Sequence, residues 1–131
     1  MYPWMAVALG GALGSVARYG MNRLVRYAWP LSRFPIETVV VNLVGCFAIG
    51  VLAGLVAAGR LPLRTNWREF VFVGVLGGFT TFSAFGLDTL TLVRSGQAAS
   101  ALINVVLQVV GGLAGVLAGL RLVERIAAAA R

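Results

Sequence analysis

Long apolar stretches separated by short polar connections dominate this chain. A membrane-spanning helix needs about 20 predominantly apolar residues, and four stretches reach that length. They cover about Trp4–Leu24, Thr38–Gly59, Glu69–Val93 and Ala98–Val123. The connections "VRYAWPLSRFP", "RLPLRTNW" and "RSGQ" carry Pro, Arg and turn residues. The pattern predicts an all-α membrane protein in which residues 1–131 form a single domain of four transmembrane helices.

Composition agrees with lipid as the main solvent. The chain is 60% hydrophobic and only 11% charged, whereas a soluble domain is about one quarter charged. It has no His and one Cys, which excludes a disulfide framework and a Cys/His metal site. We find no nucleophile–base pair either, so we expect no enzymatic activity.

The positive charge is distributed along the chain rather than clustered. The net charge is +7, carried by eleven Arg and no Lys. Because these arginines lie near the ends of the spans, we interpret them as membrane-flanking anchors and expect no nucleic-acid partner. The face with both termini would hold Arg60, Arg64, Arg68, Arg121, Arg125 and Arg131. The other face would hold Arg23, Arg26, Arg33 and Arg94, with Arg18 a further candidate.

This arginine balance leaves the orientation open. Six arginines against four or five give almost no positive-inside bias. The near balance favours insertion in both orientations, and therefore an antiparallel, dual-topology homodimer. Insertion in one orientation, set by the C-terminal arginines, is the alternative.

Glycines recur four residues apart in the spans. Such spacing lets helix backbones approach closely, and packing holds helices together in lipid. It occurs at Gly10/Gly14, Gly50/Gly54, Gly74/Gly78 and Gly111/Gly115/Gly119. We expect these glycines to lie at helix–helix contacts.

Two polar stripes occur inside the apolar spans. Thr38 and Asn42 share one helix face, as do Asn104 and Gln108, because residues four apart are neighbours on a helix. Interhelical hydrogen bonding is the simpler explanation. However, the stripes are neutral, and Asp88 is the only central acid. Neutral donors suit an anion that must bind and leave again.

The stretch "GGFTTFSAFG", residues 77–86, interrupts the third apolar span. Its glycines and threonines favour unwinding of the helix near its middle, which is tolerated where the backbone is buried in protein or lines a cavity. Phe82 and Phe85 follow on one face, and the positive edge of an aromatic ring can solvate an anion. Packing is the alternative role for both rings.

The same stretch carries a family resemblance. "GGFTTFSAFGLDT" resembles the "GGxTTFSTF" signature of the Fluc (CrcB) fluoride-channel family. "VVVNLVGCFAIG" and "GALGSVARYGMNR" resemble that family's second-span Asn motif and the end of its first span. The resemblance implies a dual-topology antiparallel homodimer in the cell (inner) membrane, whose pores export fluoride passively from the cytoplasm.

The resemblance also implies roles for individual residues. The fluoride pathway would be lined by Asn42, Phe82, Phe85, Thr38, Thr81, Ser83, Asn104 and Gln108. Arg18 would lie in the vestibule. A structural Na⁺ at the dimer centre would be held by the backbone carbonyls of Gly77 and Thr80. The chain departs from the family pattern at Ala84, usually Thr, and at Asn104 and Gln108, usually Tyr and Ser.

Two other functions remain as alternatives. A small drug or cation exporter can also be a four-span antiparallel dimer, but that class uses a glutamate in its first span, and residues 2–24 contain no acid. A non-conducting membrane assembly subunit would use the polar residues only to hold helices together. Ion flux through the purified protein would separate these alternatives.

Overall fold

A computed structural model describes residues 2–61 and 64–129, which contain helices and no strand. Arg131, part of the arginine count, lies outside the described residues. The elements are α1 (Pro3–Ala28), α2 (Ile36–Ala57), α3 (Thr65–Arg68), the π-helical segment η1 (Glu69–Leu76), α4 (Gly77–Phe79), α5 (Phe82–Arg94) and α6 (Ala98–Ala129).

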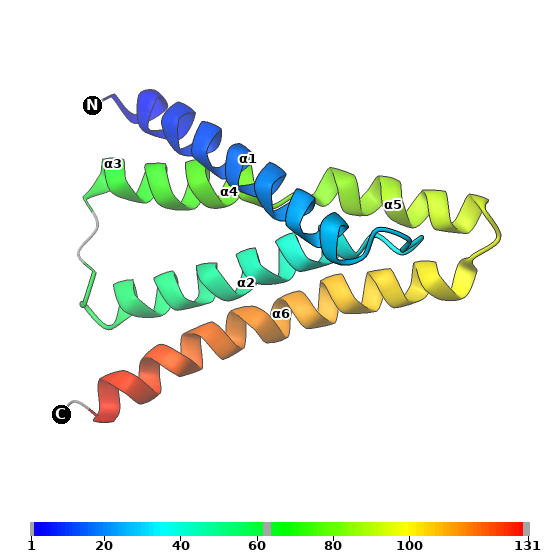
Figure 1. Ribbon diagram of the computed structural model, residues 1–131. Coiled ribbons are helices and arrows are strands. Elements are labelled where there is room, and N and C mark those ends of the chain that lie inside the picture. The colour runs from blue at the N-terminus through cyan, green and yellow to red at the C-terminus, as the bar shows by residue number, and fades with distance from the viewer. Residues whose placement is uncertain (1, 62–63, 130–131) are drawn as a thin grey trace.

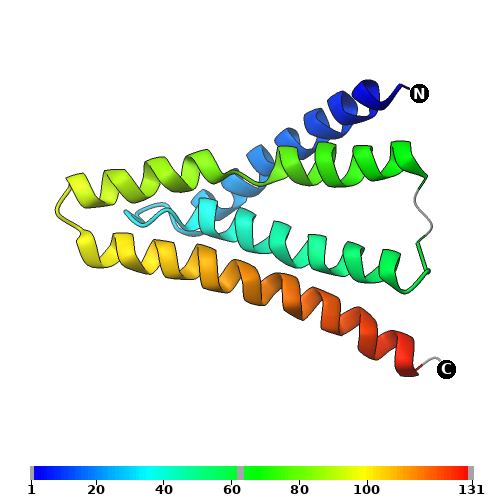
Figure 2. The ribbon, with the colours of Figure 1, turned by 180° about the vertical axis from the view of Figure 1, so that it is seen from behind.

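The helices form a bundle in which α1 crosses the others obliquely (Figure 1). Helices α2 and α6 lie side by side and run in the same direction, while the row from α3 to α5 runs in the opposite direction (Figures 1 and 2). The start of α1, the end of α2, the start of α3 and the end of α6 all lie at one end of the bundle. The two remaining connections lie at the other end.

Glycines make the closest helix contacts, as the spacing predicts. A Cβ on Gly10 would lie 2.9 Å from the Cα of Gly74, where α1 crosses η1. A Cβ on Gly119 would lie 2.5 Å from the carbonyl oxygen of Phe47, where α6 packs on α2. Since a real Cβ does not fit at such distances, backbone packs directly on backbone at both crossings.

Three helical stretches are long and apolar enough to cross a membrane. They are Ile36–Ala57, Asn66–Arg94 and Ala98–Ala129, with mean hydropathies of 2.5, 1.8 and 2.1. Only 28%, 17% and 17% of their most apolar windows are buried inside the chain. Most of this apolar surface therefore faces outward, as expected where lipid replaces water. Helix α1 has 26 residues but is not among the three.

The middle of the third stretch contains two extended residues. Thr80 has φ −82° and ψ 162°, and Thr81 has φ −153° and ψ 114°. Helix α4 ends just before them, and α5 begins just after them. The sequence pattern predicted unwinding from the glycines and threonines together; Gly77 and Gly78 are helical, whereas Thr80 and Thr81 are extended. β-Branched threonine suits extended backbone. Gly78 instead allows the backbone of α1 to approach, because a Cβ added at Gly78 would lie 2.6 Å from the carbonyl oxygen of Gly11.

Candidate functional site

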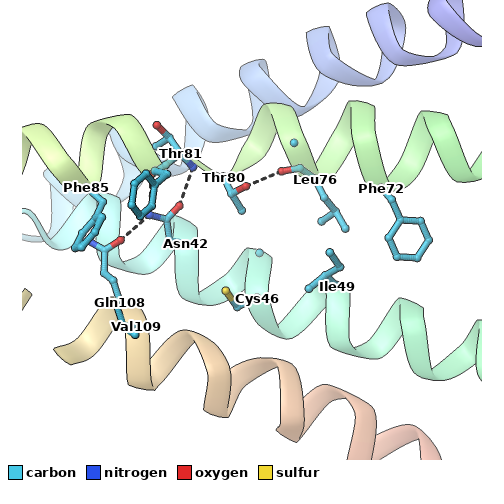
Figure 3. A pocket seen from close by; sticks show the side chains of 13 residues that line it. Asn42, Cys46, Ile49, Phe72, Leu76, Thr80, Thr81, Phe85, Gln108 and Val109 are labelled. Carbon is cyan, nitrogen blue, oxygen red and sulfur yellow. Dashed lines mark hydrogen bonds between the residues drawn. The ribbon is translucent and has the colours of Figure 1, made fainter. Parts of the chain in front are cut away.

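Asn42 on α2 binds the extended backbone between α4 and α5. Its Oδ1 accepts a hydrogen bond from the Thr81 amide at 2.8 Å, and its Nδ2 donates to the Thr81 carbonyl at 3.0 Å. Figure 3 shows the Asn42 side chain directed at Thr81. A side-chain amide thus satisfies both polar groups of a residue outside the helices, which matters because unpaired backbone groups are costly in hydrocarbon.

The same interruption diverts two N–H groups from the helical hydrogen-bond pattern. In a continuous helix the Thr81 amide would donate to the Gly77 carbonyl, but it donates to Asn42 instead. The Ala84 amide would donate to the Thr80 carbonyl, but it donates instead to the Thr81 hydroxyl, which caps α5, at 3.2 Å. The Thr80 carbonyl accepts a bond from Arg18 Nη1 at 3.4 Å. The carbonyls of Gly77 and Thr80 therefore lack the usual intrahelical donors.

A chain of side-chain hydrogen bonds extends from Asn42 towards α5. Asn42 Nδ2 donates to Gln108 Oε1 at 2.6 Å, and Gln108 Nε2 donates to Asn104 Oδ1 at 2.9 Å. Asn104 Nδ2 donates to the Thr89 hydroxyl at 2.9 Å, which donates to the Phe85 carbonyl at 2.7 Å. Asn104 is fully buried. This chain joins α2, α6 and α5 through uncharged groups.

A cavity of about 350 Å³ lies beside this chain. Its lining residues are Asn42, Gly45, Cys46, Ile49, Phe72, Leu76, Gly77, Thr80, Thr81, Phe82, Phe85, Gln108 and Val109 (Figure 3). The rings of Phe82 and Phe85 lie 5.3 Å apart between centroids, inclined at 52°. Phe82 is 81% exposed, whereas Phe85 is half-buried. The cavity thus has an apolar wall with three aromatic rings, of Phe72, Phe82 and Phe85, and a polar side with the amides of Asn42 and Gln108.

The remaining predicted residues lie apart from this cavity. Thr38, 7% exposed, donates its hydroxyl to Asp88 Oδ2 at 2.7 Å. Ser83 is exposed, with its hydroxyl 3.2 Å from that of Thr81. Arg18 reaches the interruption from α1 through the Thr80 carbonyl. The structure therefore brings Asn42, Thr81 and the amides of α6 together, and binds Thr38 to Asp88 instead.

Thr89 is a member of this hydrogen-bond chain that the sequence did not predict. Its hydroxyl bonds the carbonyl four residues earlier, the usual local partner of a helical threonine. Such a residue gives no signal in a single sequence. Only the fold shows that Asn104 of α6 binds the same hydroxyl.

Residues 5–120 match the family described as "CrcB-like protein, Camphor Resistance (CrcB)". The chain belongs to the CrcB-like family. A relative from Methylobacillus flagellatus, "Fluoride-specific ion channel FluC", is 47% identical over 95% of this chain and 96% of its own length. Relatives of the same name from Paracoccus denitrificans and Rhodospirillum rubrum are 50% and 48% identical, over 91% and 88% of this chain and 92% and 90% of their own lengths.

Membership of the CrcB-like family confirms the resemblance found in the sequence. The match covers α1 to most of α6 and includes every residue of the cavity wall. Together with the three apolar helices, it makes the chain a multi-pass membrane protein.

Proposed function

We propose that this protein is a fluoride channel that lets fluoride leave the cytoplasm passively across the cell's inner membrane and so reduces its toxicity. The observation that carries the proposal is the 47–50% identity, over 88–95% of the chain, to relatives named as fluoride-specific ion channels. A passive pathway needs no carboxylate that binds and releases protons, which agrees with the uncharged amides beside the cavity.

The chemistry of the cavity suits a small anion. Amide and hydroxyl donors can replace part of a hydration shell, and sites must be weak enough to release the ion. The ring edges of Phe82 and Phe85 add weak positive potential and carry no charge that would trap the anion. Thr81 adds a hydroxyl to the cavity lining, and the exposed Ser83 hydroxyl lies 3.2 Å from it.

The proposed assembly is an antiparallel dimer of four-span protomers, each with its third span broken at Thr80 and Thr81. Phe82 supports a partner surface, because a large ring 81% exposed beside an open cavity leaves apolar area that a second copy could cover. The balanced arginine distribution supports opposite orientations. Helix α1, the first in the chain, would be the remaining span beside the three apolar stretches, although its arginines lower its mean hydropathy.

We further propose a structural Na⁺ held by the carbonyls of Gly77 and Thr80. Among the described residues no cluster of three or more His, Cys, Asp or Glu is present, so backbone oxygens are the natural ligands. The two carbonyls fit, because the amides that would bind them in a helix bond elsewhere. Arg18 donates to the Thr80 carbonyl over a long 3.4 Å, a contact that a cation would replace.

An exporter of drugs or cations fits the site less well. The exporter class needs a carboxylate in its first span, and α1 contains none. The carboxylate of Asp88 binds the Thr38 hydroxyl, away from the cavity. A non-conducting subunit explains the hydrogen bonds but leaves the cavity without a role.

Growth of fluoride-sensitive cells that express this chain tests the proposed direction and purpose of transport. A fluoride-sensitive bacterial strain expressing this chain should grow at fluoride concentrations that stop the strain alone, with less fluoride in its cytoplasm. Asn42→Ala, which removes the amide at the cavity, should abolish this protection at equal expression. Equal sensitivity with and without the wild-type chain, expressed and in the membrane, would contradict the proposal.

A further inference from the structure

The orientation of the Asn42 amide follows from the backbone that it binds. The Thr81 N–H can only donate and the Thr81 C=O can only accept, so Oδ1 must face the first and Nδ2 the second. The other hydrogen of Nδ2 goes to Gln108 Oε1 at 2.6 Å. An amide nitrogen has two hydrogens, and both hydrogens of Asn42 Nδ2 are therefore in use.

The far end of the chain fixes the orientation of Gln108 as well. The Phe85 carbonyl can only accept, so the Thr89 hydroxyl donates to it and accepts from Asn104 Nδ2. The Asn104 oxygen then faces Gln108 and accepts from its Nε2. Every bond from Asn42 to Phe85 thus donates in the same direction. Gln108 cannot turn its amide over without placing donor against donor at Asn42 and acceptor against acceptor at Asn104.

This directionality has a consequence for an anion at Asn42. An anion needs donor hydrogens, but one hydrogen of Asn42 Nδ2 is bound to the Thr81 carbonyl and the other to the Gln108 carbonyl oxygen. That oxygen would also repel an anion at the same place. Gln108 is half-buried and lines the cavity, so its side chain borders the cavity volume.

We propose that Gln108 is a competing acceptor that must release the Asn42 amide before an anion can bind there. The inference rests on the proposed function, because it assumes that an anion passes this cavity. Gln108 then weakens anion binding and sets the rate at which Asn42 becomes available.

The substitution Gln108→Met tests this role because it keeps the length of the side chain and removes its amide. A net hydrogen bond is worth an amount equivalent to about two- to tenfold in an equilibrium constant. We expect the half-saturating fluoride concentration for efflux from liposomes to fall by that factor. Gln108→Glu should slow efflux, since a carboxylate accepts more strongly from Asn42 and repels the anion. Leu107→Met, on the neighbouring position outside the cavity, is the control for methionine in α6.

Dependence on Asn42 separates competition from a structural role. In an Asn42→Ala background, Gln108→Met should give no gain, because the donor that it frees is missing. If Gln108 only joins helices, Gln108→Met should lower the yield and the flux and should not lower the half-saturating concentration. A folded Gln108→Met protein whose half-saturating concentration is unchanged or higher would overturn the inference.

An NMR measurement on the wild-type protein tests the release of Asn42 by Gln108 directly. It does not depend on whether the Gln108→Met variant folds. The chain has two glutamines, Gln97 and Gln108, so wild-type protein labelled with ¹⁵N-glutamine gives two side-chain signals, which Gln97→Ser assigns. Fluoride should shift the Gln108 signal and leave the Gln97 signal in place. If the wild-type protein conducts fluoride without this shift, the inference is wrong and the proposed function stands. If it does not conduct, the proposed function is wrong, and the inference, which assumes that an anion passes the cavity, is overturned with it.

Discussion

Two glycines on one helix face should respond oppositely to the same substitution. Gly115 and Gly119 both pack α6 on α2 and lie one turn apart. A Cβ on Gly119 would lie 2.5 Å from the Phe47 carbonyl oxygen and 2.6 Å from the Val51 amide nitrogen. A Cβ on Gly115 would find its nearest atom, the Phe47 amide nitrogen, at 3.5 Å. Only Gly119 is therefore closed to a methyl group.

The magnitude follows from these distances. Ordinary contact begins at 3.4 Å, so Gly119→Ala must move α6 outward by about 0.9 Å, since 3.4 − 2.5 = 0.9. A gap of this size forfeits about a quarter to a half of the dispersion energy at neighbouring contacts, and overpacking costs about 1–3 kcal/mol. Replacing Gly by Ala returns about 0.5–1 kcal/mol of helix stability. We expect Gly119→Ala to lose about 0–2.5 kcal/mol net, and Gly115→Ala to be neutral or slightly more stable, so that the two variants differ by about 1–3 kcal/mol.

Equilibrium unfolding in mixed micelles, followed by helical circular dichroism, measures this difference. The detergent fraction at the midpoint should fall for Gly119→Ala and stay or rise for Gly115→Ala. Both proteins should be compared at equal concentration, because association would shift the midpoints. Equal midpoints for the two variants would refute the inference that backbone packs directly on backbone at Gly119.

Three further predictions concern the pathway, a buried hydrogen bond and the orientation. Phe82→Ile or Phe85→Ile should slow fluoride efflux from liposomes while leaving the folded yield nearly unchanged, because Ile keeps apolar bulk without a ring edge; normal efflux in both variants would show that the rings only pack. Thr38→Val should lower the free energy of unfolding by about 1–3 kcal/mol in the same unfolding assay, because Asp88 loses its 2.7 Å donor. Thr38→Ser keeps a hydroxyl donor and should keep most of the wild-type stability; equal stability of the two variants would contradict this prediction. Arg60→Cys, in a background without the native cysteine, should be labelled from both sides of intact cells by an impermeant thiol reagent, and labelling from one side only would exclude opposite orientations.

The length and apolar content of the stretches predicted the helices well because membrane insertion depends on local properties. Span length and apolar content are readable from one segment at a time, and the predicted second and fourth spans agree with α2 and α6 within six residues at each end. The glycine spacing also predicted contacts such as that of Gly119 with α2, because a missing side chain is visible in the sequence.

The site was less predictable because its bonds join residues far apart in sequence. The stripe of Thr38 and Asn42 was expected to act together, yet the fold sends Thr38 to Asp88, 50 positions later, and Asn42 to Thr81 and Gln108. Which partner each polar group finds depends on the register between helices, and a single sequence does not contain that register. The glycines and threonines of the third span likewise suggested where the helix changes, but not that the glycines stay helical while the two threonines are extended.

The central claim is that this protein conducts fluoride selectively, and efflux from liposomes tests it most directly. Purified protein should be reconstituted into liposomes loaded with fluoride and chloride, and the release of each ion followed with its own electrode after the membrane potential is collapsed. We predict rapid protein-dependent release of fluoride, with chloride leaving no faster than from protein-free liposomes. Release of both ions at similar rates, or of neither from well-folded protein, would contradict the proposed function.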